Sequence, residues 1–111
     1  MAYDEDLAER VRRSLHAQHG DHVEKKMFGG VCFMVGGHMT CGILRDEMMV
    51  RVGKEAHEAA LARPHAREMD FTGRSLKGMV YVAPEGLDAQ RDLDAWVAAG
   101  LAHARSLPPK G

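Results

Sequence analysis

The segment VCFMVGGHMTCGILRDEMMVRV, residues 31–52, decides the fold of this chain. Apolar residues surround Gly36-Gly37, and a pair of glycines supplies the positive φ angles of a tight hairpin turn. The segment therefore predicts two antiparallel strands, Val31–Val35 and His38–Leu44. A short polar turn then leads into a third strand over Glu47–Val52.

Working outward from this segment, periodicity predicts helices before and after the strands. A first helix with Asp4 as its N-cap carries an apolar residue every four positions. Residues before Pro64 avoid helical backbone, so a short second helix ends there. The first helix is predicted over residues 4–19, the second over 54–63, and a further strand over Ser75–Val82. A last helix is predicted from an N-cap at Asp88 to about Ser106. Its apolar stripe consists of Leu93, Trp96, Val97, Gly100, Leu101 and Ala104.

Successive side chains of a strand point to opposite faces, so regular pairing across the turn sorts residues 31–52 into two faces. One face then contains only apolar residues and is predicted to be the core: Cys32, Met34, Met39, Cys41, Ile43, Met48, Val50 and Val52. The other face is mixed: Phe33, Val35, His38, Thr40, Leu44, Glu47, Met49 and Arg51. With helices covering the core face, we expect an α+β fold, an antiparallel sheet of about four to five strands with the N- and C-terminal helices packed on one face.

The same register places Cys32 opposite Cys41, close enough for a strained disulfide. Thiol reactivity depends on the thiolate, and a buried apolar thiol without a neighbouring cation is inert. Two buried free cysteines are therefore the main interpretation, and a redox switch between Cys32 and Cys41 is the alternative.

Other kinds of site have weaker support in the sequence. The paired glycines lack the spacing of a dinucleotide or phosphate-binding loop. His38 is predicted on the face opposite the cysteines, and His16, His19 and His22 do not follow a zinc signature, so no metal and no cofactor are expected. No catalytic motif is present, and the sequence gives no reason to expect an enzyme.

Composition indicates a single domain over residues 1–111 that folds without metal or disulfide. The net charge of −1 gives no basic field for nucleic acid, so DNA binding by this domain alone is disfavoured. It stays an alternative through Lys25, Lys26, Arg51 and Lys77. The acidic N-terminus and the lack of a long apolar run predict a cytoplasmic protein without a membrane partner.

The mixed face raises the question of what covers it. Phe33, Val35 and Met49 lie there, and the later strand adds Met79 and Tyr81. Apolar patches of this kind mark contact surfaces unless another part of the chain covers them. A protein partner or a second copy of this chain is the expected occupant.

Several short motifs resemble the N-terminal domain of the TfoX/Sxy family, regulators of bacterial competence for DNA uptake. The resemblance covers roughly residues 5–105 and is most specific at Met27-Phe28-Gly29-Gly30, which follows Lys25-Lys26. The other motifs that carry it are Gly37-x-Met39, Glu47-Met48-Met49-Val50-Arg51-Val52, the Tyr81–Pro84 strand exit and the last helix with Trp96. Cys32, Cys41 and Gly36 depart from the expected pattern.

The resemblance implies a curved antiparallel sheet with helices on one side and a non-enzymatic regulatory module. Members with two domains carry a second, helical domain, whereas this sequence resembles the N-terminal domain standing alone. We expect Lys25, Lys26, Phe28, Gly29 and Gly30 to form a surface loop whose lysines meet an acidic partner, or a strand entry with a purely structural role. The predicted contact face is completed by Phe33, Met49, Met79 and Tyr81.

Overall fold

The computed structural model describes residues 3–27, 29–70 and 75–108. Within them, six strands form one antiparallel sheet in the order β1-β2-β3-β4-β6-β5. The strands are β1 (Val23–Met27), β2 (Gly30–Val35), β3 (His38–Leu44), β4 (Glu47–Arg51), β5 (Ala66–Asp70) and β6 (Ser75–Val82). The predicted α+β class is confirmed, and the two edge strands β1 and β5 are additional to the four strands assigned from sequence.

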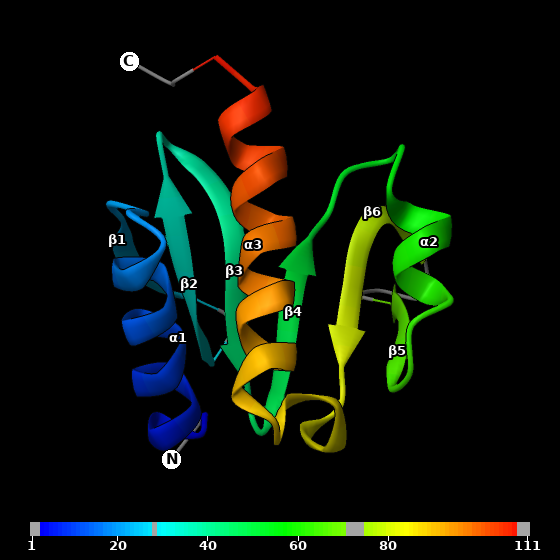
Figure 1. Cartoon of the computed structure of the whole chain (residues 1–111), viewed down its shortest axis with the longest axis horizontal. Coiled ribbons are helices and arrows are strands. Elements are labelled where there is room, and N and C mark those ends of the chain that lie inside the picture. Colours follow the sequence, from blue (N-terminus) through cyan, green and yellow to red (C-terminus); the bar gives the residue numbers. More distant parts are fainter. Residues whose placement is uncertain (1–2, 28, 71–74, 109–111) are drawn as a thin grey trace.

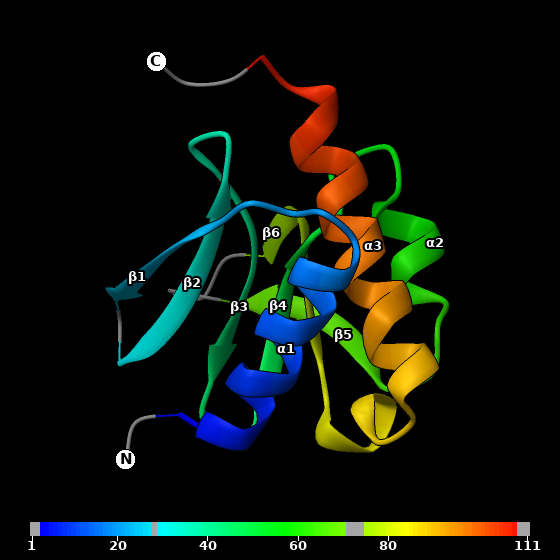
Figure 2. The same ribbon diagram turned by 60° about the vertical axis from the view of Figure 1, so that its left-hand side comes forward.

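In the described part of the chain, three helices cover one face of this sheet (Figures 1 and 2). They are α1 (Glu5–Ala17), α2 (His57–Leu61) and α3 (Gln90–Ser106), and the short 3₁₀ helix η1 (Pro84–Leu87) precedes α3. All four contribute to one buried core with the sheet, in which Trp96, Leu15 and Leu87 are almost fully inaccessible. No helix among the described residues has the length and apolarity needed to cross a membrane.

The predicted N-cap is confirmed for α1 and is wrong for α3. Asp4 is the N-cap of α1, as predicted, and its Oδ1 accepts a hydrogen bond from the Leu7 amide at 3.1 Å. Asp88 is not the N-cap of α3, because it ends η1, and Ala89 takes the N-cap position without a side-chain hydrogen bond. The predicted apolar stripe of α3 is buried at all six positions.

The β2–β3 hairpin contains a register shift that the sequence pattern did not predict. Met34 pairs with Met39 beside the turn, but Phe33 pairs with Cys41, so Thr40 is an extra residue in β3. An extra residue of this kind is a β-bulge, and a one-residue slip exchanges the two faces of a strand. Cys32 consequently pairs with Gly42 and not with Cys41.

The bulge corrects several of the face predictions. Phe33 is fully buried in the helix-covered core, and Val35 packs against that core. His38 and Thr40 are also buried; His38 Nε2 lies 2.6 Å from the Pro108 carbonyl oxygen, beyond the end of α3. The predicted core positions of Cys41, Ile43, Met48, Val50 and Val52 are confirmed. Those of Cys32, Met34 and Met39 are wrong, since these residues belong to a second cluster.

Candidate protein-contact face

The second cluster consists of strand residues alone and lies on the sheet face that none of the described helices covers. Its centre is buried and its periphery is half-buried. We call it the methionine face; its residues are Cys32, Met34, Met39, Leu44, Met49, Met79 and Tyr81. Methionine side chains are flexible and polarizable, and such surfaces adapt to partners of varied shape.

A glycine in the middle of β3 shapes the centre of the methionine face. A Cβ at Gly42 would lie 2.9 Å from Met49 Cε and 3.3 Å from Cys32 Sγ. Both side chains therefore lie over the bare backbone of Gly42, and Met49 is only 5% exposed. Because position 42 has no side chain, Met49 and Cys32 pack closely against the backbone at the centre of the face.

A cation and a carboxylate border the face near Tyr81. The Arg67 guanidinium lies 4.6 Å from the centroid of the Tyr81 ring. Its two terminal nitrogens donate to the Glu47 carboxylate at 2.6 and 2.9 Å. These hydrogen bonds raise the pKa of Arg67 above its ordinary value. The positive charge of Arg67 thereby compensates the negative charge of Glu47 at this border.

The opposite end of the methionine face is open and carries a lysine. Val23 pairs with Met34 and Lys25 pairs with Cys32, and directly paired residues share a face. Val23 is 63% exposed, the largest exposure of a bulky apolar residue among the described positions. A hollow of about 290 Å³ is lined by Asp21, His22, Val23, Lys25, Met34, Gly36 and Gly37.

The structure brings four of the predicted contact residues together. Met49 pairs with Tyr81, and Met79 joins the same cluster. Lys25 lies on the same face through its pairing with Cys32. Phe33 was predicted beside them, and this prediction is wrong because the bulge turns its ring into the core.

The residues predicted to form a loop before β2 differ in their positions and roles in the structure. Lys26 pairs with the core residue Val31, so it lies on the face opposite Lys25. Gly29 has a φ of 77°, and a Cβ at Gly30 would collide with the Ile43 carbonyl oxygen. Both glycines thus have the structural role that was one of the two interpretations. Phe28 lies outside the described residues.

The two cysteines point to opposite faces of the sheet. Cys41 belongs to the core beneath the helices and Cys32 to the methionine face, and both are free thiols. Burial raises the pKa of each thiol, and the neighbouring Cys32 adds to the effect at Cys41. The opposed pair on which the redox hypothesis depended is therefore absent. No group of His, Cys, Asp and Glu residues within the described part of the chain is arranged to hold a metal ion.

Sequence reasoning missed Cys32, Met34 and Met39 as members of the methionine face, and it placed Leu44 on this face without naming it as a contact residue. The first three were assigned to the core because regular alternation was assumed throughout the hairpin. One signal was available: Gly42 lies inside a strand, where an isolated glycine is typical of a bulge or a close approach.

The described residues thus form a single antiparallel sheet with helices on one face, and the other face is sulfur-rich and is covered by none of these helices. Residues 5–104 match the family model described as the TfoX N-terminal domain. The chain belongs to the TfoX N-terminal domain family. Comparison with curated proteins and with solved structures gave no match.

Proposed function

We propose that this protein is a non-enzymatic, cytoplasmic regulatory module that acts by protein contact, and that the methionine face docks an amphipathic helix with acidic flanks. Membership of the TfoX N-terminal domain family supports a role like that of the competence regulators. The single observation that carries the docking proposal is the cluster of Cys32, Met49 and Tyr81, with half-buried methionines around it, on a sheet face that none of the described helices covers.

Charge favours an acidic partner over a second copy of the chain. Lys25 and Arg51 border the face, and neither has a carboxylate within ion-pair distance among residues 3–27, 29–70 and 75–108. Glu47 is already held by Arg67. Two copies docked through this face would bring like charges together, whereas acidic flanks would pair with them.

An amphipathic helix fits the shape of the face as well as its charge. Apolar anchors at i, i+3, i+4 and i+7 of a helix insert into hydrophobic grooves, and methionine-rich surfaces accept such anchors readily. The hollow between Val23 and Met34 offers a place for one anchor, next to the Lys25 ammonium.

Methyl NMR on protein labelled at the methionine methyl groups tests this proposal directly. The probe is a synthetic leucine–glutamate amphipathic helix, with a leucine–lysine helix of the same apolar pattern for comparison. We expect the methyl signals of Met34, Met39 and Met79 to shift with the acidic peptide only. Met48 is fully buried on the helix side of the sheet and should not respond, which makes it an internal control.

Two adjacent lysines provide a matched pair of variants. Lys25→Glu reverses a charge on the methionine face, and Lys26→Glu makes the same change on the opposite face. We expect the first to weaken binding of the acidic peptide about tenfold and the second to leave it within about twofold. Equal effects of the two variants, or no shift with the acidic peptide, would refute the docking proposal. A dimer in light scattering that Met34→Lys dissociates would show that a second copy is the occupant instead.

A further inference from the structure

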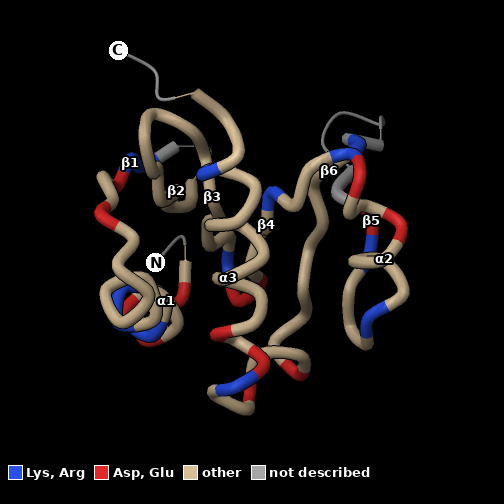
Figure 3. The backbone as a smooth tube through the Cα atoms, turned by 45° about the horizontal axis from the view of Figure 1, so that its top comes forward, with Lys and Arg blue, Asp and Glu red and all other residues tan. Residues whose placement is uncertain are grey.

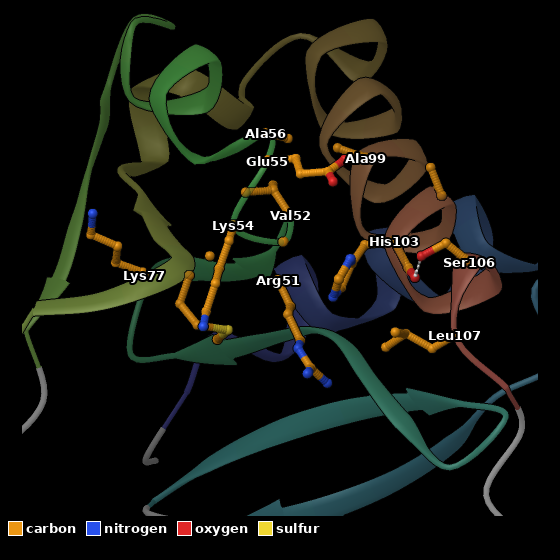
Figure 4. Close-up of a pocket in the computed structure, with 14 residues that line it drawn as sticks. Arg51, Val52, Lys54, Glu55, Ala56, Lys77, Ala99, His103, Ser106 and Leu107 are labelled. Atoms are coloured by element: carbon orange, nitrogen blue, oxygen red, sulfur yellow. Dashed lines mark hydrogen bonds between the residues drawn. The ribbon is translucent and has the colours of Figure 1, made fainter.

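A second concave region lies at one end of the sheet, between the loop after β4 and the C-terminal half of α3 (Figure 4). It has a volume of about 800 Å³, within the range of small-molecule sites. Its walls come from three parts of the chain, the end of β4 with the loop that follows, the middle of β6, and α3. The charged and polar residues that line it are Arg51, Lys54, Glu55, Lys77, His103 and Ser106.

Hydrogen bonds fix the floor of this hollow. The Gly78 carbonyl oxygen accepts from the amides of Val52 at 2.8 Å and Gly53 at 3.1 Å. The Gly78 amide donates to Nδ1 of the buried His57 at 2.9 Å. Gly53 and Gly78 have φ angles of 87° and 91°, which glycine adopts without strain. The hollow is therefore a built feature of the fold.

The same glycines make room for an imidazole. A Cβ at Gly53 would lie 2.5 Å from His103 Nδ1, so the His103 ring rests directly against the Gly53 backbone. Ala99 and Ala102 on α3 add only small side chains to the wall. The missing side chain of Gly53 and the small side chains of Ala99 and Ala102 thus leave space in the hollow beside the His103 ring.

Positive charge gathers at this end of the molecule. Figure 3 shows basic residues in blue near the labels of β4 and β6, while acidic residues in red accumulate where α3 begins. In Figure 4 the Arg51, Lys54 and His103 side chains extend on the same side of the hollow, and Lys77 points away. Glu55 is the one carboxylate among the lining residues.

The cations in the hollow lack internal counterions. Arg51 and Lys54 form no ion pair with any residue that the structure describes. Burial lowers the pKa of His103, and the charges of Arg51 and His38 lower it further. An anion bound beside His103 would offset this repulsion.

We propose that this hollow binds a small phosphorylated molecule, with its phosphoryl group held by Arg51, Lys54 and His103. A guanidinium supplies two parallel N–H donors to phosphate oxygens, and a lysine supplies a compact charge. The body of the ligand would lie against Val52 and Met79, which contribute apolar surface to the same hollow.

Calorimetry with three probes tests this assignment at low salt: inorganic phosphate, AMP and adenosine. We expect saturable binding of AMP, competition by inorganic phosphate, and no binding of adenosine. Binding of AMP should also raise the pKa of His103, followed through its imidazole signals and assigned with His103→Gln. His16 is exposed on α1 and does not line the hollow, so its imidazole signals serve as a reference for the spectra.

The variant Arg51→Gln/Lys54→Gln should weaken AMP binding at least about tenfold, because charged hydrogen bonds to the phosphate are lost. The control Arg13→Gln/Lys26→Gln removes the same charge from α1 and β1 and should leave affinity within about twofold. Thermal melts of both variants, and of each single substitution, verify that the fold is retained.

Three results would overturn the proposal. They are no saturable binding of either phosphate probe, equal losses in the two double variants, or adenosine binding as tightly as AMP. A DNA duplex that binds more tightly than AMP and requires Arg51 and Lys54 would show instead that this end of the molecule contacts nucleic acid. Arg51 and Met79 belong to both the methionine face and this hollow, so neither distinguishes the two proposals. Lys25 and Met34 do not line the hollow and report on the peptide alone, whereas Lys54 and His103 line only the hollow and report on AMP alone.

Discussion

Gly100 of α3 rests against the backbone carbonyl of Thr40 in β3. A Cβ at position 100 would lie 2.5 Å from that oxygen and 2.9 Å from Thr40 Cγ2. The long helix therefore approaches the sheet closely at the bulge that reverses the faces of the β2–β3 hairpin.

Gly100→Ala tests how rigid this contact is. Alanine favours helix by up to about 1 kcal/mol relative to glycine, but overpacking against a fixed backbone costs about 1–3 kcal/mol. We expect a net loss of about 1 kcal/mol or more in the free energy of unfolding, measured by urea denaturation. Ala98→Ser, on the exposed side of the same helix, should change stability by about 0.5 kcal/mol or less. A Gly100→Ala protein as stable as the parent would show that α3 is not held at this distance.

Thr40 itself offers a second test of the bulge. Its Oγ1 is buried and has no hydrogen-bond partner among the described residues. Replacing an unsatisfied hydroxyl by a methyl group of similar shape is neutral or stabilising, so Thr40→Val should raise the free energy of unfolding by up to about 1 kcal/mol. Thr40→Ser keeps the hydroxyl and removes the methyl group near Gly100, and should lower it by about 1 kcal/mol. The reverse order of these two variants would contradict the burial of Oγ1.

The hairpin shows how far local sequence rules extend in this protein. The Gly36-Gly37 turn, the bounds of β3 and the pairing of β3 with β4 all follow from turn chemistry and alternation. These rules assume an unbroken ladder. The bulge brings Thr40 against Gly100, a contact between residues 60 positions apart that local rules do not predict. Within the hairpin itself, the isolated Gly42 is the local signal of an irregular ladder.

The edge strands show a different limit. β1 reads VEKKM and β5 reads AREMD, and neither has the apolar alternation of a half-buried strand. Each is a strand because it hydrogen-bonds to a neighbour, β2 or β6. Charged side chains are usual on edge strands, where they oppose pairing with other chains. The methionine face was predictable only in part for the same reason, since Val23 comes to its border through β1 and was not predicted there.

The ion pair between Arg12 of α1 and Glu24 of β1 should make the free energy of unfolding depend on pH. Arg12 Nε and Nη2 donate to the Glu24 carboxylate at 2.7 and 2.9 Å. These hydrogen bonds, with a smaller contribution from the charge itself, lower the pKa of Glu24 below its ordinary value of 4.5. The stabilisation is therefore complete above pH 4.5 and is lost as the pH falls through the lowered value.

Glu24→Gln should accordingly lower the free energy of unfolding by about 0.5–1 kcal/mol at pH 7, the range for a well-formed surface pair. The difference from the parent should shrink below pH 4.5 and vanish once Glu24 is protonated in the folded state. Asp21→Asn, at an exposed residue before β1, should have little effect at either pH. Urea denaturation at several pH values gives both curves. A pH-independent difference for Glu24→Gln would mean that the pair does not stabilise the fold through charge.

The last prediction concerns the two thiols, which the fold separates. Alkylation with iodoacetamide at pH 8 should be slower for both cysteines in the native state than in urea, because burial raises both pKa values. Cys32, on the methionine face, should react before Cys41, which is fully inaccessible beneath the helices. Peptide mapping by mass spectrometry distinguishes the two. Mild oxidation should not remove two hydrogens from the intact protein, because the side chains point to opposite faces of the sheet and a disulfide needs them together. An intramolecular disulfide that forms with the fold retained would contradict the register of β2 and β3 and restore the redox interpretation.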